Sequence, residues 1–201
     1  MRPLRLYEEN GAVVCEFTLH IDARAAEPEE ARKLILEGLE RIAGEYAMAD
    51  RTVSVKVRVN IAERFSLGAI NVRLIDKTPV IRRWYDPRVN VSRAYFGTRR
   101  MGLQKLLRFV LRRPDIYINL SGRSISEPAQ RAVTCSVIQH EFGHVLGFAD
   151  KYRPRSFKKK SQAVDDRDIM YRVGNAQGFM EYHIKRLECC AKRGRLPFRN
   201  V

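Results

Sequence analysis

The sequence is poor in cysteine, in tryptophan and in long apolar runs. It contains four cysteines and one tryptophan among 201 residues. The cysteines, at positions 15, 135, 189 and 190, form no C-x-x-C pair, which excludes a zinc ribbon, and we expect free, mostly buried thiols. No apolar run approaches the length of a membrane span. The first twenty residues lack the apolar core of a signal peptide, so we expect a protein that is cytoplasmic or is delivered without a Sec signal.

Acidic residues are scarce relative to basic ones. Lys and Arg number 38 against 23 Asp and Glu, which gives a formal net charge of +15 and a pI near 10.1. A field of this size attracts acidic partners such as nucleic acid, acidic protein segments or anionic membranes, and solubility alone explains it equally well. Length and composition suit one globular domain over 1–201, with a sheet subdomain to about 147 and a C-terminal subdomain over 148–201.

Hydrophobic periodicity predicts a mixed α/β fold. Alternating apolar residues predict strands at 12–21, 52–61, 69–75 and 115–120, and an edge strand is expected within 90–96. Apolar residues at helical spacing predict helices at 28–47, 101–112, 126–146 and 177–192. The order strand, helix, strand, strand favours a mixed sheet.

The helix expected at 101–112 is short, basic and amphipathic. Its apolar residues lie on one side, at positions 103, 106, 107 and 110. We expect this side to pack on the sheet rather than on a membrane, because the polar face is short.

The stretch CSVIQHEFGHVLGFADKY, residues 135–152, contains the residues on which a catalytic site would depend. His140 and His144 are four residues apart, so on a helix they lie on one face and can bind the same ion. Neutral imidazole nitrogens are good zinc ligands. Glu141 adjoins the first histidine and can take a proton from a water whose pKa the metal lowers. This is the chemistry of metal-assisted peptide hydrolysis.

Residues after the histidine pair extend this site. Gly147 follows His144 by three residues, where a left-handed glycine can end a helix and turn the chain sharply. Asp150 lies three residues further, where the returning chain can present a third ligand. Asp168 is a rival for that ligand, ranked lower because of its spacing.

The pattern resembles the metzincin clan of zinc metallopeptidases, whose signature is H-E-x-x-H-x-x-G-x-x-H/D with a later Met-turn. The aspartate at the third position is similar to the snapalysin-like branch. By position, the resemblance implies zinc ligands His140, His144 and Asp150, the general base Glu141, and Met170 as the Met-turn residue beneath the metal. It also implies a twisted, mostly parallel sheet with an antiparallel edge strand, an active-site helix and a C-terminal helix after the Met-turn.

Other residues are expected around the cleft. Tyr152 and Tyr171 are candidates to donate a hydrogen bond to the oxyanion, and the resemblance does not decide between them. His183 is expected to be structural or on the surface. A peptide substrate should lie along the edge strand within 90–96, and the basic segment 153–160 should favour acidic or nucleic-acid-associated protein substrates.

Two other functions compete with a zinc endopeptidase, and a third alternative is a proteolytically silent scaffold that a metal stabilises. One is a toxin or effector domain of the same chemistry within a larger protein, which is an analogy alone. The other is a basic nucleic-acid-binding protein in which the histidine pair is structural. The second predicts no stoichiometric zinc and strongly salt-dependent nucleic-acid binding.

Overall fold

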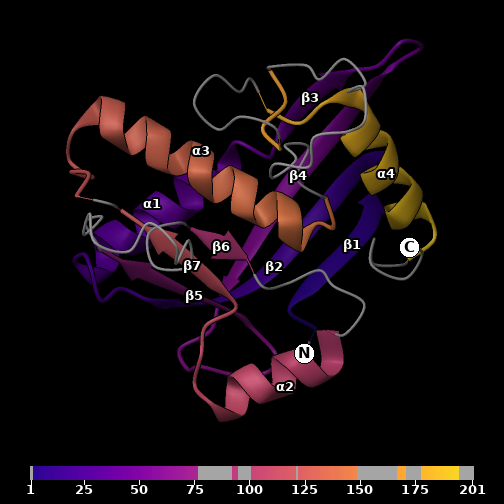
Figure 1. The fold of residues 1–201 in the computed structure, drawn as a ribbon. Coiled ribbons are helices and arrows are strands. Elements are labelled where there is room, and N and C mark those ends of the chain that lie inside the picture. Colours follow the sequence, from indigo (N-terminus) through magenta and orange to yellow (C-terminus); the bar gives the residue numbers. More distant parts are fainter. Residues whose placement is uncertain are drawn as a thin grey trace, which may run out of the picture.

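The computed structural model describes residues 2–76, 92–94, 101–120, 122–148, 167–170 and 178–194, with the backbone alone for residue 93 and residues 101–105. Along these parts of the chain the elements are β1 Leu4–Glu9, β2 Ala12–Asp22, α1 Pro28–Glu40, β3 Gly44–Ala47, β4 Thr52–Ile61, β5 Ile70–Ile75, β6 Arg93–Ala94, α2 Met101–Val110, β7 Ile116–Asn119, α3 Pro128–Val145 and α4 Glu181–Lys192 (Figure 1).

The strands form one twisted sheet in the order β3-β4-β2-β5-β7-β6, with β1 added to β2 (Figure 1). The four strands β4, β2, β5 and β7 run parallel in its centre. Strands β3 and β6 pair antiparallel at the two ends of this order, and β1 pairs antiparallel with β2. A mixed α/β fold with a parallel sheet centre and an antiparallel edge strand is therefore confirmed.

Strand β1 is missing from the sequence-based prediction. It forms a hairpin with β2 through Asn10 and Gly11, whose φ angles are 51° and 75°. Two positive φ angles in a two-residue loop are typical of a type I′ turn, for which Asn-Gly is the favoured pair. This dipeptide was the signal that could have predicted β1.

Helix α1 begins at Pro28, as predicted, but ends at Glu40 rather than near residue 47. Its buried side chains include Leu34, Ile35 and Leu39, which follow the predicted helical spacing. The predicted last turns are instead strand β3, which pairs with β4. Gly44, with φ of 151°, starts this strand, because glycine adopts such angles readily and is a poor helix former.

Helices α1 and α3 pack side by side over the sheet. They approach each other closely at Gly38, where a Cβ atom would lie 2.5 Å from Ile138 Cγ2 and 3.2 Å from the Cys135 carbonyl oxygen. On its other side α3 meets the sheet through Phe142, whose ring lies edge-on to Phe17 of β2 with centroids 5.4 Å apart. Both rings are fully buried, so the sheet covers this side of α3.

Helix α2 lies apart from the other helices, at the lower end of the molecule in Figure 1. The prediction that its apolar side packs on the sheet is wrong for the described side chains, since Leu106, Leu107 and Val110 are 47%, 57% and 68% exposed. Helix α2 is attached instead through Phe109, which stacks on Phe65 with centroids 5.8 Å apart. Within the described ranges, no helix is both long and apolar enough to cross a bilayer.

Candidate metal centre

The C-terminal half of α3 brings the two histidines of the H-E-x-x-H sequence together. Their ring centroids are 4.8 Å apart and the ring planes are nearly perpendicular, at 86°. His140 is 6% exposed and His144 is partly buried. The helical repeat alone accounts for this pairing, because residues four apart lie on one face.

Backbone carbonyl groups orient both rings. Nδ1 of His140 lies 2.8 Å from the Ile169 carbonyl oxygen, and Nδ1 of His144 lies 2.9 Å from the Phe148 carbonyl oxygen. A carbonyl oxygen only accepts hydrogen bonds, so each Nδ1 carries the proton and donates it. In the neutral ring the lone pair is then on Nε2, which is the arrangement that metal-binding histidines use.

The turn after α3 supplies one of these carbonyl groups. The Gly147 N–H donates to the His144 carbonyl at 2.9 Å, and the Phe148 N–H donates to the Gly143 carbonyl at 2.9 Å. Gly147 has φ of 84°, so the pattern is a Schellman ending with glycine in the left-handed position. The same turn that ends the helix therefore places the carbonyl of Phe148 against the ring of His144.

Met170 lies directly against α3. Its side chain is fully buried, and a Cβ atom on Gly143 would lie 2.5 Å from its Sδ atom and 3.2 Å from Phe179 Cε1. Only glycine leaves room for this contact one residue before His144. Sequence reasoning did not single out Gly143, although a glycine inside a helix costs about 1 kcal/mol relative to alanine and so signals a packing constraint.

Asp168 holds the turn that carries Ile169 and Met170. It is 2% exposed, and its Oδ1 accepts the Met170 N–H at 2.8 Å while its Oδ2 accepts the Tyr182 hydroxyl of α4. The sequence made Asp168 a rival third metal ligand. Its oxygens are instead hydrogen-bonded within this turn and to α4, so it supports the site by fixing the Ile169 carbonyl that orients His140.

His183 is structural, in agreement with one of its two expected roles. It is 3% exposed, and its Nδ1 accepts the Met180 N–H at 3.1 Å, which caps the start of α4. Its ring packs on Phe148 with centroids 4.3 Å apart. His183 thus links α4 to the turn after α3 and is not one of the paired imidazoles.

The structure describes only some of the residues that the sequence predicts for the site. Glu141 is 4% exposed on the same turn of α3 as His140. Asp150, Tyr152 and Tyr171 lie outside the described residues, as does the basic segment 153–160. Among the residues that are described, no group of three or more His, Cys, Asp or Glu side chains could hold a metal ion.

Strand β6 is the last strand in the sheet order, next to β7. Arg93 and Ala94 pair antiparallel with Tyr117 and Ile116 of β7, and the strand contacts α3. These two residues fall within the range 90–96 in which an edge strand was expected. The rest of that range lies outside the described residues, apart from Ser92.

No protein-family model matches the chain, and no curated protein matches it by sequence. Two solved structures resemble it. Archaemetzincin from Methanopyrus kandleri shares 11% identity with a TM-score of 0.48, over 86% of this chain and 93% of that one. Myroilysin shares 15% identity with a TM-score of 0.47, over 92% of this chain and 95% of that one.

Proposed function

We propose that the protein is a zinc-dependent endopeptidase that hydrolyses peptide bonds. The observation that carries the proposal is the histidine pair of α3, in which backbone carbonyls bind both Nδ1 atoms and leave the lone pairs on Nε2. A merely structural histidine needs no second imidazole beside it, because other polar groups can bind the one donor and the one acceptor nitrogen of its ring.

The donor set fits zinc. His140 and His144 would be two ligands, and Asp150 would be the third, since a carboxylate is a competent zinc ligand and three protein ligands leave one open position. Bound zinc would act as a Lewis acid that lowers the pKa of water to about 7 and polarises the scissile carbonyl.

Protein groups would handle the proton and the substrate. The Glu141 carboxylate would accept a proton from the attacking water and return it to the leaving amine nitrogen. Tyr152 or Tyr171 would donate a hydrogen bond to the developing oxyanion. An extended peptide would add to the edge strand β6, through backbone hydrogen bonds. The basic segment 153–160 would favour acidic residues near the scissile bond.

Zinc content and casein cleavage test the proposal, measured on the wild type, on Glu141→Gln and on Glu40→Gln. Glu40 is an exposed glutamate at the end of α1, so its variant controls for the same change of charge. We expect about one zinc per chain in all three proteins, and cleavage lowered by roughly 10²–10⁴-fold in Glu141→Gln alone. A wild type that lacks zinc and binds DNA with strong salt dependence would overturn the proposal and favour the nucleic-acid-binding protein.

Asp150→Ala tests the third ligand separately. Loss of a ligand should weaken zinc binding by more than about 100-fold, since even the residues that support a ligand contribute 10–100-fold. Competition with a chelator measures the affinity. Unchanged affinity would place the third ligand elsewhere in the chain.

A further inference from the structure

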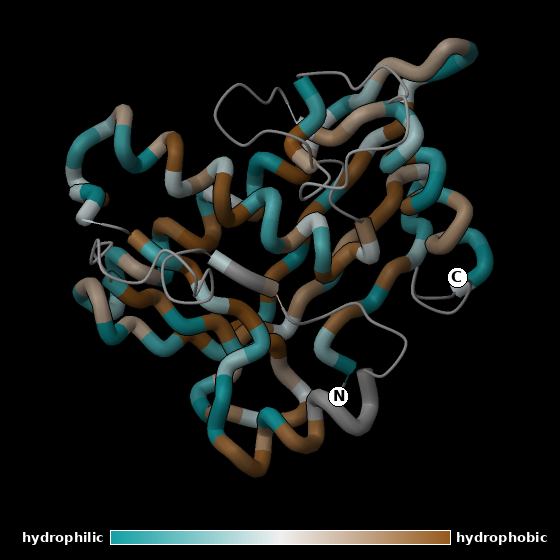
Figure 2. The backbone as a smooth tube through the Cα atoms, in the orientation of Figure 1, coloured by the Kyte–Doolittle hydropathy of each residue, from teal (hydrophilic) through white to brown (hydrophobic). Residues whose placement is uncertain are grey.

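Exposed apolar side chains gather at one end of the molecule. The described residues include eight large apolar side chains that are exposed, and six of them lie in two segments. These six, which we call the α2 patch, are Ile61, Leu67, Leu106, Leu107, Val110 and Leu111. Figure 2 shows the hydrophobic segment at the lower end of the molecule, where α2 ends. Scattered single apolar residues need no explanation, but such a cluster marks an interaction surface.

The two segments form one surface because an aromatic stack joins them. Phe109 of α2 stacks on Phe65, in the loop between Ile61 and Leu67, and Phe65 in turn lies edge-on to His20 of β2. The packing of Phe109 thus attaches α2 to the sheet.

The apolar side of α2 faces away from this attachment. At 100° per residue, positions 106, 107, 110 and 111 cover an arc of about 140° on the helix surface. Residues 108 and 109 lie outside that arc. Phe109 makes the attachment, and the Arg108 guanidinium donates to the Pro114 carbonyl just after the helix. The stripe is therefore left uncovered by the described chain, with Val110 the most exposed at 68%.

The rim of the patch is positively charged along α2, whereas Glu63 and Arg64, both exposed in the other segment, balance each other. Residues 101–113 contain four basic side chains and no acidic one, and Arg112 and Arg113 are exposed beside Leu111. The next acid, Asp115, is 3% exposed, and its Oδ2 accepts hydrogen bonds from the N–H and side-chain amide of Asn71. Asp115 therefore does not neutralise the arginines at the surface.

This combination selects the partner. A second copy of the chain would bring the same arginines face to face, and each copy has a net charge of +15. An uncharged apolar protein surface would leave the arginines without counter-ions. An anionic bilayer supplies both requirements, because phosphate groups pair with guanidinium groups while the acyl boundary takes up leucine and valine side chains.

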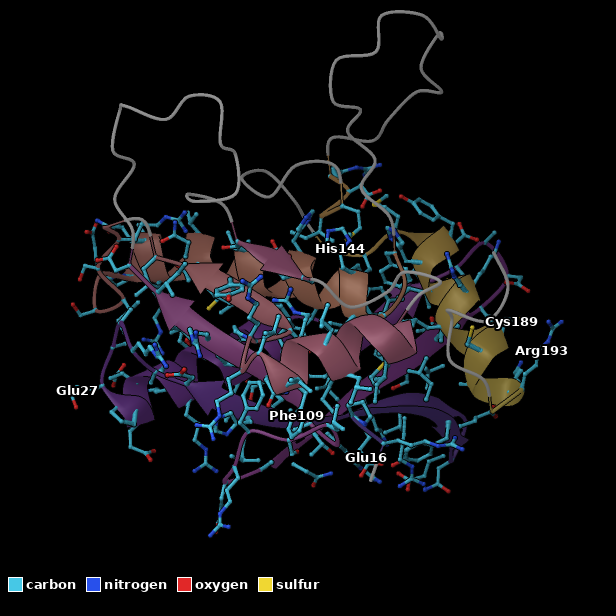
Figure 3. All side chains as sticks on the ribbon, turned by 60° about the horizontal axis from the view of Figure 1, so that its bottom comes forward. Glu16, Glu27, Phe109, His144, Cys189 and Arg193 are labelled. Atoms are coloured by element: carbon cyan, nitrogen blue, oxygen red, sulfur yellow. The ribbon has the colours of Figure 1, made fainter. Side chains whose placement is uncertain are left out.

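We propose that the α2 patch binds peripherally to the surface of an anionic lipid bilayer. Helix α2 lies apart from the His144 end of α3, as the labelled Phe109 and His144 show in Figure 3. Binding at the patch is thus independent of zinc and of the proposed hydrolysis.

Vesicle co-sedimentation tests this with phosphatidylcholine alone and with phosphatidylcholine mixed with phosphatidylserine. We expect the wild type to bind only the mixed vesicles. Val110→Glu and Leu107→Glu should each lower the partition coefficient by about tenfold or more, because each removes an apolar side chain from the lipid and adds a negative charge. Val133→Glu is the matched control, because Val133 is 44% exposed on α3, outside the patch.

A second pair of variants distinguishes the effect of a basic residue at the patch from the effect of the protein's net charge on binding. Arg112→Gln should weaken binding roughly fivefold, by the usual contribution of one basic residue near an anionic surface. Arg32→Gln, at an exposed position of α1, should leave it unchanged. Equal binding to both vesicle types, or equal loss in Val110→Glu and Val133→Glu, would overturn the proposal. So would no vesicle binding together with capture by polyglutamate or formation of a dimer that Val110→Glu abolishes.

Discussion

Helices α3 and α2 place residues in opposite kinds of unfavourable environment. In α3 the polar residues Gln139, His140 and Glu141 are only 4–6% exposed, whereas in α2 the apolar residues Leu107 and Val110 are more than half exposed. Burial of a polar group without a partner costs several kcal/mol, and exposure of an apolar side chain forfeits about 1.5–3 kcal/mol. Both helices therefore carry features that core packing alone does not explain.

The two helices differ in how the unfavourable term is offset. Polar groups need partners at defined positions, and α3 has them: the Gln139 side-chain amide donates to the Arg41 carbonyl at 2.8 Å, and His140 to the Ile169 carbonyl. The hydrophobic effect is not directional, so the stripe on α2 needs only a surface to cover it. Buried polar groups need partners from within the same chain, whereas another molecule can cover an exposed apolar patch.

Truncation of one apolar side chain on each helix tests whether α3 is packed at Phe142 and α2 is uncovered at Val110. Phe142→Ala should lower the free energy of unfolding by about 3–5 kcal/mol, because it opens a cavity against Phe17. Val110→Ala should change it by no more than about 0.5 kcal/mol, as at other exposed positions. Urea unfolding measures both. A large loss from Val110→Ala would mean that α2 is covered in the free protein.

Removal of the Asp168 carboxylate tests whether the polar residues of α3 depend on hydrogen-bond partners at defined positions. Asp168→Ala leaves the buried Met170 N–H without its acceptor, which costs about 1–3 kcal/mol. It also removes the acceptor of the Tyr182 hydroxyl, at a smaller cost because Tyr182 is 45% exposed. Because the turn orients His140 through Ile169, zinc affinity should also fall by about 10–100-fold. Asp50→Ala, at an exposed position, is the control for lost charge. Lower stability with unchanged zinc affinity would separate Asp168 from the metal centre.

The smallest change that we expect is in the pH dependence of stability, and it comes from Cys15 in strand β2 of the sheet. Burial raises the pKa of the Cys15 thiol from 9.0 to about 12, so the folded protein keeps a proton that the unfolded chain releases. Stability is complete below pH 9 and is lost as pH rises toward 12, by about 1.4 kcal/mol per pH unit at most. Cys15→Ala should flatten this slope, measured by urea unfolding between pH 8 and 10. Cys189→Ser, at an exposed position of α4, should retain the slope, and a slope lost equally in both variants would contradict the prediction.

Local pattern was sufficient for several elements. Strict alternation located β4 at Thr52–Ile61, and helical spacing identified the buried side of α1. The end of α1 was wrong because the choice between helix and strand over Gly44–Ala47 depends on pairing with β4. A window of sequence does not contain that distant partner.

Some features of the candidate site also follow from local sequence, and others depend on contacts with distant parts of the chain. The pairing of His140 with His144 follows from a spacing of four residues on one helix. The roles of Asp168 and Gly143 do not, because they depend on Tyr182 of α4 and on Met170, which lie beside these two residues only in the folded chain. From its chemistry Asp168 was named as a rival to Asp150 for the third ligand and ranked lower, and its hydrogen bonds to Met170 and Tyr182 indicate a supporting role.

Elements whose signal is local follow from the sequence alone: the alternating strands, the glycine that ends α3, and two imidazoles on one helical face. Tertiary structure decided which ring nitrogen carries the proton, through a carbonyl 29 residues further along the chain, and which apolar face is covered. The helices α2 and α3 both have apolar side chains, yet of the two it is α3 that packs against α1 and the sheet in the described part of the chain. Periodicity states that a face is apolar, and only the arrangement of the other elements determines whether anything lies against it.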